Sequence, residues 1–176
     1  MSRKWTENRA LAALVLIAAV LLGVVGLGCV KVKNLAAGPV EYYETNMAAD
    51  FAARESAAQS LLTLAQGQVE DSLVQQAQTA LDQSRAAETP ADRYAAGLSL
   101  KTAVELVYNA LPADERDGQG SPAQMAWSEF TSRTAILSHM VPEYNEQARA
   151  AAQRLSGFPA SLWATLTGAQ AKEMVA

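Results

Sequence analysis

The sequence has little of what many small catalytic or secreted domains depend on. It contains one cysteine and one histidine, which excludes an intrachain disulfide, a multi-cysteine zinc site and a histidine cluster. It also lacks a glycine-rich phosphate loop and the HExxH and GxSxG motifs. The sequence therefore names no reaction, and we expect a protein that is not an enzyme and that carries no catalytic residue, metal or cofactor.

Turn-forming and aromatic residues are scarce too, with 10 glycines, 6 prolines and an aromatic fraction of 6%. The chain is rich instead in alanine, with 36 among 176 residues. Alanine has the highest helix propensity, and no long segment alternates with the period of two that a half-buried strand shows. This composition predicts an all-α fold.

The longest uncharged segment lies near the N-terminus. Residues 10–30 read ALAALVLIAAVLLGVVGLGCV and contain no charged side chain. As a helix, this segment would be about 31 Å long, close to the thickness of the hydrocarbon core of a bilayer. We therefore expect a short basic flank at 1–9, a transmembrane helix at 10–30 and a helical domain at 31–176.

Two alternatives concern how this segment is processed. A cleaved signal peptide normally has a shorter apolar core of about 7–15 residues. Leu27, Gly28 and Cys29 resemble the end of a bacterial lipobox, although Gly26 stands where a larger aliphatic residue is usual. Cys29 is thus a candidate lipidation site, and the alternative is a free thiol at the end of the helix.

Basic residues flank the segment on both sides. Arg3, Lys4 and Arg9 precede it, and Lys31 and Lys33 follow it. The positive-inside rule therefore favours a cytoplasmic N-terminus. We expect a single-pass protein of the bacterial inner or plasma membrane, with the helical domain on the extracytoplasmic side.

The remainder of the chain has the apolar periodicity of long helices. Residues 40–87 carry an apolar stripe at steps of three, four or seven, and Gly67 is the expected point of division. Thr89-Pro90 predicts a capped helix that runs through Leu111, and Ser121-Pro122 predicts another that runs to about Leu155. Three to four such helices with short connections predict an antiparallel long-helix bundle.

Prolines lie at each of three expected irregularities. Gly38-Pro39 predicts a break after the membrane segment, and Pro142 predicts a kink near Val141 in the last long helix. The charged segment 112–122 predicts a loop.

The helical domain is acidic. Residues 31–176 contain 11 basic and 17 acidic side chains. A surface of this sign repels phosphate, so we expect no nucleic-acid partner. The expected partners are the lipid bilayer and either another protein or a second copy of this chain, because Gly23, Gly26 and Gly28 lie near one face of the span.

The C-terminal segment carries a specific pattern. Tyr144-Asn145-Glu146 is followed by Phe158-Pro159, which starts thirteen residues after the asparagine, and then by Leu162 and Ala164. This pattern resembles the C-terminal signature of the LemA family, and Arg54 falls where that family has an arginine. The segment 53–61 lacks the second arginine, the aspartate and the proline of the family pattern, so the chain resembles a divergent member.

The resemblance implies an N-terminal anchor followed by an antiparallel bundle, without an established activity. The matching residues, which we expect to be structural, are Arg54, Tyr144, Asn145, Phe158, Pro159 and Leu162. For Tyr144 and Asn145 a recognition patch is the alternative to packing and capping. For Phe158 the alternative to closing the end of the core is docking a partner.

These observations lead to one main functional hypothesis. We expect a single-pass, membrane-anchored helical bundle that acts as a non-enzymatic interaction or scaffold module of the bacterial cell envelope. The alternatives are an extracytoplasmic bundle that senses a ligand between its helices, or a lipoprotein anchored through Cys29.

Overall fold

The computed structural model describes residues 3–118 and 120–175, without the side chains at 3–11, 17, 20–22, 24, 25 and 117. Within these ranges the chain forms seven α-helices and one π-helical segment, and it forms no strand. The helices are α1 (Arg3–Tyr42), α2 (Ala48–Ala65), α3 (Asp71–Ala86), α4 (Pro90–Ala110), α5 (Ala113–Asp117), α6 (Pro122–Ser156) and α7 (Ala160–Thr167), and the π-helical segment η1 (Tyr43–Met47) joins α1 to α2. The expected all-α fold is confirmed.

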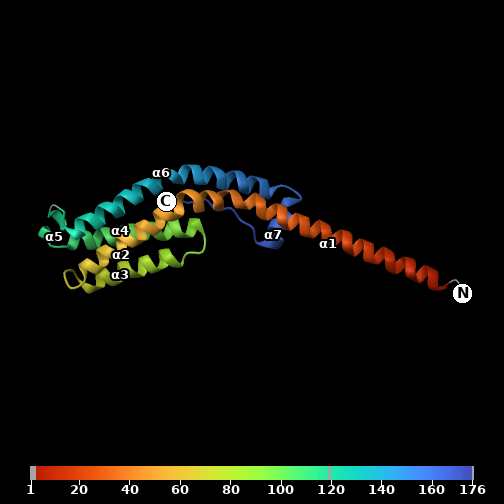
Figure 1. The fold of residues 1–176 in the computed structure, drawn as a ribbon, viewed down its shortest axis with the longest axis horizontal. Helices are drawn as coiled ribbons and strands as arrows, with labels where there is room; N and C mark the ends of the chain where they lie inside the picture. The colour runs from red at the N-terminus through yellow and green to blue at the C-terminus, as the bar shows by residue number, and fades with distance from the viewer. Residues whose placement is uncertain (1–2, 119, 176) are drawn as a thin grey trace.

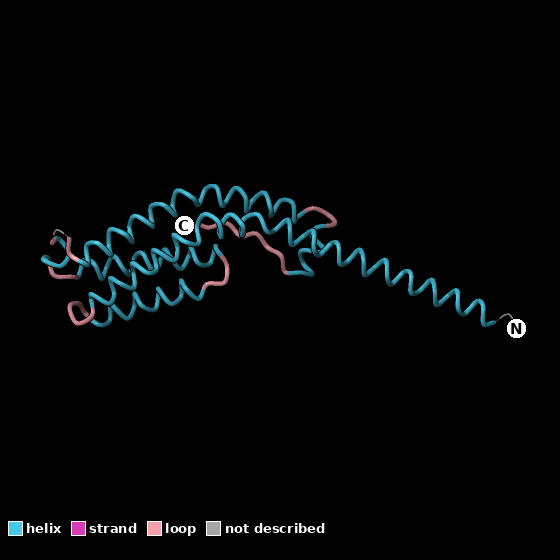
Figure 2. Tube along the Cα trace, in the orientation of Figure 1, coloured by secondary structure: helices cyan, strands magenta, loops and turns pink. Residues whose placement is uncertain are grey.

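The helices form an elongated bundle from which one helix projects. α1, η1 and α2 follow one another as a long rod, whose N-terminal part extends beyond the rest of the molecule (Figure 1). Within the bundle, α2 packs on α6, α3 packs on α4, and α7 packs on both α1 and α6. Short loops connect the helices (Figure 2), so the expected helical bundle is confirmed.

Local signals set the helix boundaries as expected. The Thr89 side chain accepts a hydrogen bond from the Asp92 N–H at 3.2 Å, and Pro90 begins α4. In the same way, Ser121 accepts from the Gln124 N–H at 3.0 Å at the start of α6. Gly67 has a φ of +73° in the turn between α2 and α3, a conformation that favours glycine, so the expected division there is confirmed.

The expected break at Gly38-Pro39 is wrong. α1 continues through Pro39 to Tyr42, and the irregularity comes later, as the π-helical segment η1. Proline removes one backbone hydrogen bond from a helix. The packing of α1 against α6 and α7 offsets this loss, with Val32, Pro39 and Tyr43 all buried.

The expected loop 112–122 contains the short helix α5. The Arg116 N–H bonds the Pro112 carbonyl at 2.9 Å, and the Tyr108 hydroxyl donates to the Arg116 carbonyl at 2.8 Å. Proline at 112 costs this turn nothing, since its missing N–H would be unpaired at a helix start.

Two clusters of buried side chains form the core. The larger one joins α2, α3, α4 and the first turns of α6. The smaller one joins η1 and the start of α2 to the second half of α6 and the C-terminal tail, through Tyr43, Met47, Phe51, Leu137, Tyr144, Ala148 and Met174. The side chains of Val104 on α4 and Phe130 on α6 are buried in the larger cluster.

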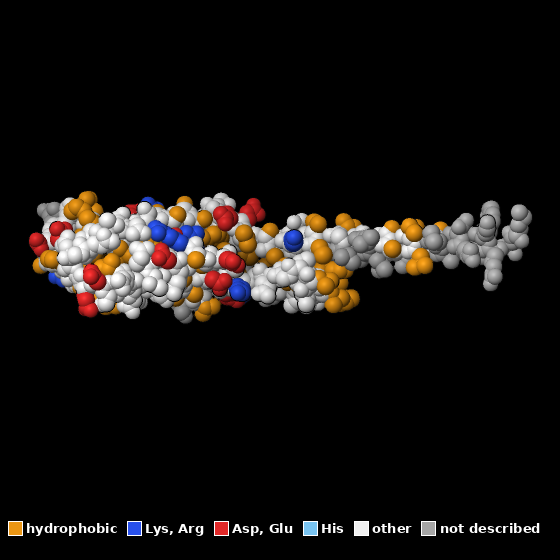
Figure 3. All heavy atoms as spheres, turned by 90° about the horizontal axis from the view of Figure 1, so that it is seen from below, with side chains coloured by type: hydrophobic (Ala, Val, Ile, Leu, Met, Phe, Trp, Pro, Cys, Tyr) orange, Lys and Arg blue, Asp and Glu red, His pale blue; other side chains and the backbone are white. Residues whose placement is uncertain are grey.

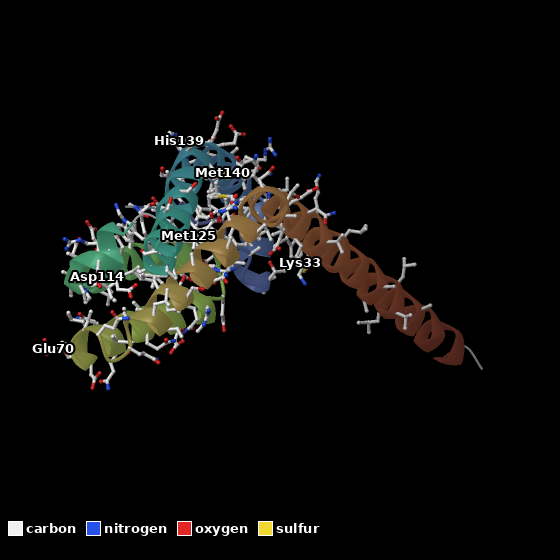
Figure 4. All side chains as sticks on the ribbon, turned by 60° about the vertical axis from the view of Figure 1, so that its left-hand side comes forward. Lys33, Glu70, Asp114, Met125, His139 and Met140 are labelled. Atoms are coloured by element: carbon white, nitrogen blue, oxygen red, sulfur yellow. The ribbon has the colours of Figure 1, made fainter. Side chains whose placement is uncertain are left out.

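α6 continues through Pro142 but does not run straight. The helix changes direction close to the labelled His139 and Met140 (Figure 4). This is where the missing N–H of Pro142 removes a bond from the helical ladder. The bend lets the second half of α6 follow α1 while the first half follows α2.

In the part of the chain that is described, no helix combines the length and hydropathy that crossing a membrane requires. The span expected at 10–30 includes residues 10, 11, 17, 20–22, 24 and 25, whose side chains lie outside the described ones. The side chains of the basic flank at 1–9 lie outside them as well.

Candidate functional site

The sequence-predicted residues fall into two places in the fold. Arg54 is buried on α2, and Tyr144 is buried on α6 with Asn145 half-buried beside it. Phe158 and Pro159 form the turn between α6 and α7, and Leu162 lies exposed on α7. Cys29 is a free, half-buried thiol on α1.

A buried polar cluster surrounds Arg54. Its centre is Glu55, which is 3% exposed. Arg93 on α4 donates from Nη2 to Glu55 Oε2 at 2.5 Å and from Nε to Oε1 at 2.9 Å. The Ser84 hydroxyl, from the end of α3, donates to Glu55 Oε1 at 2.7 Å. Three helices are thus joined through one carboxylate.

The cluster extends to η1 through Tyr43. Arg93 Nη1 donates to the Tyr43 hydroxyl oxygen at 2.8 Å. The hydrogen bonds from Arg93 to Glu55 raise the pKa of its guanidinium further above its ordinary value. Burial raises the pKa of the Tyr43 phenol, against the opposing effect of Arg93. Arg93 is therefore a cation and Tyr43 a neutral phenol over the physiological range.

Arg54 lies next to this network but outside it. Its Nε and Nη2 atoms are buried and donate to no acceptor within the described residues. The guanidinium lies 5.1 Å from the centre of the Phe51 ring, a cation–π contact. Burial lowers the pKa of Arg54, and the nearby Glu55 opposes this shift.

Gly97 on α4 makes room for this buried guanidinium. A Cβ atom at Gly97 would lie 2.0 Å from Arg54 Nη2, far inside van der Waals contact. α4 can approach α2 at this level because residue 97 has no side chain.

Sequence reasoning did not point to the four residues that form the network beside Arg54, which are Glu55, Ser84, Arg93 and Tyr43. One feature of the sequence does indicate that Glu55 is buried. Glu55 follows Phe51 by four residues and precedes Ala58 by three, so it stands on the apolar stripe of its helix. A carboxylate at such a position needs a buried cationic partner, although the spacing does not say which of the later arginines supplies it.

A pocket of about 430 Å³ lies beside the buried polar cluster. Its walls come from the end of α1, η1, the α3–α4 connection, the start of α4, α6 and the C-terminal tail. Its polar lining combines two phenols, two cations and two carboxylates: Tyr43, Tyr144, Arg93, Lys172, Glu44 and Glu88. Burial raises the pKa of Tyr144, so both phenols are neutral hydrogen-bonding groups suited to a small polar molecule.

Asn145 fastens the C-terminal tail that forms one wall of this pocket. Its amide donates to the Met174 carbonyl at 2.8 Å and accepts from the Met174 N–H at 2.7 Å. Met174 itself is 2% exposed in the smaller core cluster. The asparagine thus acts as a clamp for an otherwise extended segment.

Replacing Asn145 by alanine is expected to release this tail. Two hydrogen bonds of about 1 kcal/mol each are lost, so the amides of residues 169–175 should exchange faster while those of α2 and α4 keep their protection. Hydrogen exchange followed by mass spectrometry measures both. Glu146→Ala, at the exposed neighbouring position, is the control and should leave the exchange rates of both regions unchanged. Equal exchange of the tail amides in the Asn145 and Glu146 variants would contradict the clamp.

The second place where predicted residues gather is an apolar surface at the base of the projecting helix. We call it the exit surface; it comprises Leu27 (76% exposed), Val30 (58%), Phe158 (85%), Leu162 (55%) and Leu166 (72%). Figure 3 shows hydrophobic side chains gathered where α1 leaves the bundle. The expectation that Phe158 closes the end of the core is therefore wrong.

The exit surface has a physical origin. Leu155 is the last buried residue of α6, and the turn at Phe158 extends beyond the core toward the projecting part of α1 (Figures 1 and 2). On α7, Trp163 lies against Gly28 so closely that a Cβ at Gly28 would be 2.6 Å from the indole. By contrast, Trp127 stacks on Tyr108 at 4.6 Å, at the edge of the larger core cluster.

Other candidate sites find no geometric support among the described side chains. No group of three or more His, Cys, Asp or Glu there could hold a metal ion. His139 is exposed on α6 (Figure 4). Comparison with protein-family models, curated proteins and solved structures finds no match to this chain.

Proposed function

We propose that this protein is a single-pass, membrane-anchored helical bundle that acts as a non-enzymatic interaction module of the bacterial cell envelope, and that it is a divergent member of the LemA family. One observation carries the proposal. The uncharged segment 10–30 lies in the part of α1 that projects from the bundle (Figure 1), and the described leucines and valines there are uncovered, with Leu14 69% and Leu16 67% exposed.

The free energy of hydration supports a lipid environment for this helix. Exposed apolar surface costs about 25 cal/mol per Å² in water, and here it recurs at the described leucines and valines of the uncharged segment. Lys31 and Lys33 follow it directly and are exposed, as expected at a membrane boundary. The basic flank at 1–9 favours a cytoplasmic N-terminus and an extracytoplasmic bundle.

The proposed interaction is with another protein or a second copy of this chain. Among the described residues, a Cβ at Gly23 or Gly26 would meet no packed neighbour within 4 Å, whereas Trp163 covers Gly28, so the span is open to a neighbouring helix at Gly23 and Gly26. Small residues let membrane helices approach closely. The acidic surface of the bundle argues against nucleic acid as a partner.

Ligand sensing is the second candidate function, and the pocket beside the buried polar cluster favours it. The pocket holds about 430 Å³, enough for a small polar molecule. Its walls include the tail held by Asn145, which a bound ligand would contact directly. A lipoprotein anchored through Cys29 remains the alternative mode of attachment.

Extraction of bacterial membranes with alkaline carbonate tests the anchor. The wild-type full-length chain should stay in the membrane pellet. Ala18→Lys with Ala19→Lys should be released, because each lysine near the centre of a span costs about 3 kcal/mol. Ala49→Lys with Ala52→Lys adds the same charge at exposed positions outside the span and should stay in the pellet.

Three outcomes would overturn parts of the proposal. Release of the wild-type chain, or retention of the Ala18/Ala19 variant, contradicts the span. An intact mass that begins at a lipidated Cys29 replaces the span with a lipid anchor. A clean monomer after cross-linking in intact cells contradicts the interaction module.

A further inference from the structure

The α6–α7 turn and α7 form an uncharged segment with one exposed apolar face. Between Arg154 and Lys172 the sequence contains no charged residue. Leu162 and Leu166 lie four residues apart on α7 and so share one face, and Phe158 lies in the turn just before that helix. All three side chains are more than half exposed. An apolar face of this kind marks a site of contact with another surface.

The position of this face is fixed by α1. Trp163 lies against Gly28, which is part of the uncharged segment 10–30. The turn before α7 lies at the end of the bundle from which α1 projects (Figures 1 and 2). Figure 4 places Lys33 on α1 near α7, with Glu70 and Asp114 at the opposite end of the bundle.

This contact sets the depth of α7 relative to a bilayer. If residues 10–30 span the hydrocarbon core, Gly28 lies about 3 Å inside its boundary, and Trp163 lies at the same level. Tryptophan favours this interfacial region. The exposed cation Arg154 ends α6 just before the uncharged segment and suits the phosphate level, whereas Lys172 lies further from the span and pairs with Asp92 at 3.9 Å.

We propose that residues 157–167 are a second lipid-contacting element, which inserts the Phe158–Leu162–Leu166 face into the bilayer interface beside the α1 span. This inference rests on the proposed membrane anchor. It assigns the exit surface to lipid because that surface continues directly into the uncharged helix through Leu27 and Val30. The bundle is then held against the membrane at two points.

Depth-dependent quenching tests the second contact. The full-length chain, with Cys29→Ser, receives a single cysteine labelled with an environment-sensitive fluorophore and is reconstituted in phosphatidylcholine–phosphatidylglycerol vesicles that contain acyl-brominated lipid. The label replaces Phe158, Leu14 in the proposed span, or Met125, which is 59% exposed at the start of α6. We expect strong loss of emission at Leu14, intermediate loss with a blue shift at Phe158, and none at Met125.

The three labels separate the failure of each proposal. Absence of quenching at Leu14 contradicts the anchor itself. Quenching at Leu14 with a Phe158 signal equal to that of Met125 overturns the second contact and leaves the anchor standing. A Phe158 label that is blue-shifted but not quenched by brominated lipid shows a protein on the exit surface, and it also overturns the lipid assignment.

Discussion

Replacing Glu55 by glutamine is expected to lower the free energy of unfolding by about 3 kcal/mol. The substitution keeps the shape of the side chain but removes the charge that faces Arg93 Nη2 at 2.5 Å. The Glu55 side chain is only 4% exposed, so water cannot replace the lost partner. Urea unfolding of the detergent-solubilised full chain, followed by circular dichroism, measures the change.

The neighbouring Arg54 makes this loss larger than a single ion pair would suggest. Removing the carboxylate leaves two guanidinium groups on the same Phe51 ring, at 5.1 and 5.5 Å from its centre. In an Arg54→Met background the same substitution should therefore cost less, and a double-mutant cycle measures the difference.

Glu129→Gln is the matched control for Glu55→Gln. Glu129 pairs with Arg133 within one helix, at 2.6 Å, but its side chain is 48% exposed. Solvent screens such a pair, so we expect no measurable change in the free energy of unfolding. Equal losses for the Glu55 and Glu129 variants would contradict the structural importance of the buried polar cluster.

Replacing Phe51 by alanine is expected to lower the free energy of unfolding by about 3–5 kcal/mol. The ring is 0% exposed and lies 5.6 Å from the Tyr43 ring. Its loss opens a cavity in the smaller core cluster and removes the cation–π contacts of Arg54 and Arg93. The same unfolding measurement applies.

Phe158→Ala is the matched control for this change. The substitution is the same, but the Phe158 side chain is 85% exposed. Its removal therefore opens no cavity, and the free energy of unfolding should not fall. A loss at Phe158 equal to that at Phe51 would show that the exit surface is part of the folded core. A small loss at Phe51 would show that its site collapses without cost.

Much of the helical layout could be read from the sequence because its signals are local. A threonine or serine before a proline supplies a cap and a compatible first residue, and both α4 and α6 begin at such a pair. Gly67 supplies the positive φ that ends α2. The apolar stripe predicted over residues 40–87 contains buried side chains of α2 and α3, such as Leu62 and Leu81, because every turn of a helix repeats the same orientation.

The sequence could not place residues whose positions depend on other helices. Pro39 remains helical because α1 packs on α6 and α7. Glu55 meets Arg93, 38 residues away, and Asn145 meets Met174, 29 residues away. No spacing within one helix encodes such pairs.

Phe158 shows most plainly the difference between what the sequence encodes locally and what the packing of the helices decides. By itself, the sequence determined that an apolar residue follows the last long helix, and that an uncharged segment long enough to cross a bilayer precedes the bundle. Only the tertiary structure decided that the turn carrying Phe158 extends past the core toward α1 and leaves the ring exposed. The physical reason is that burial depends on which surfaces the packed helices bring together, whereas hydropathy belongs to each residue alone.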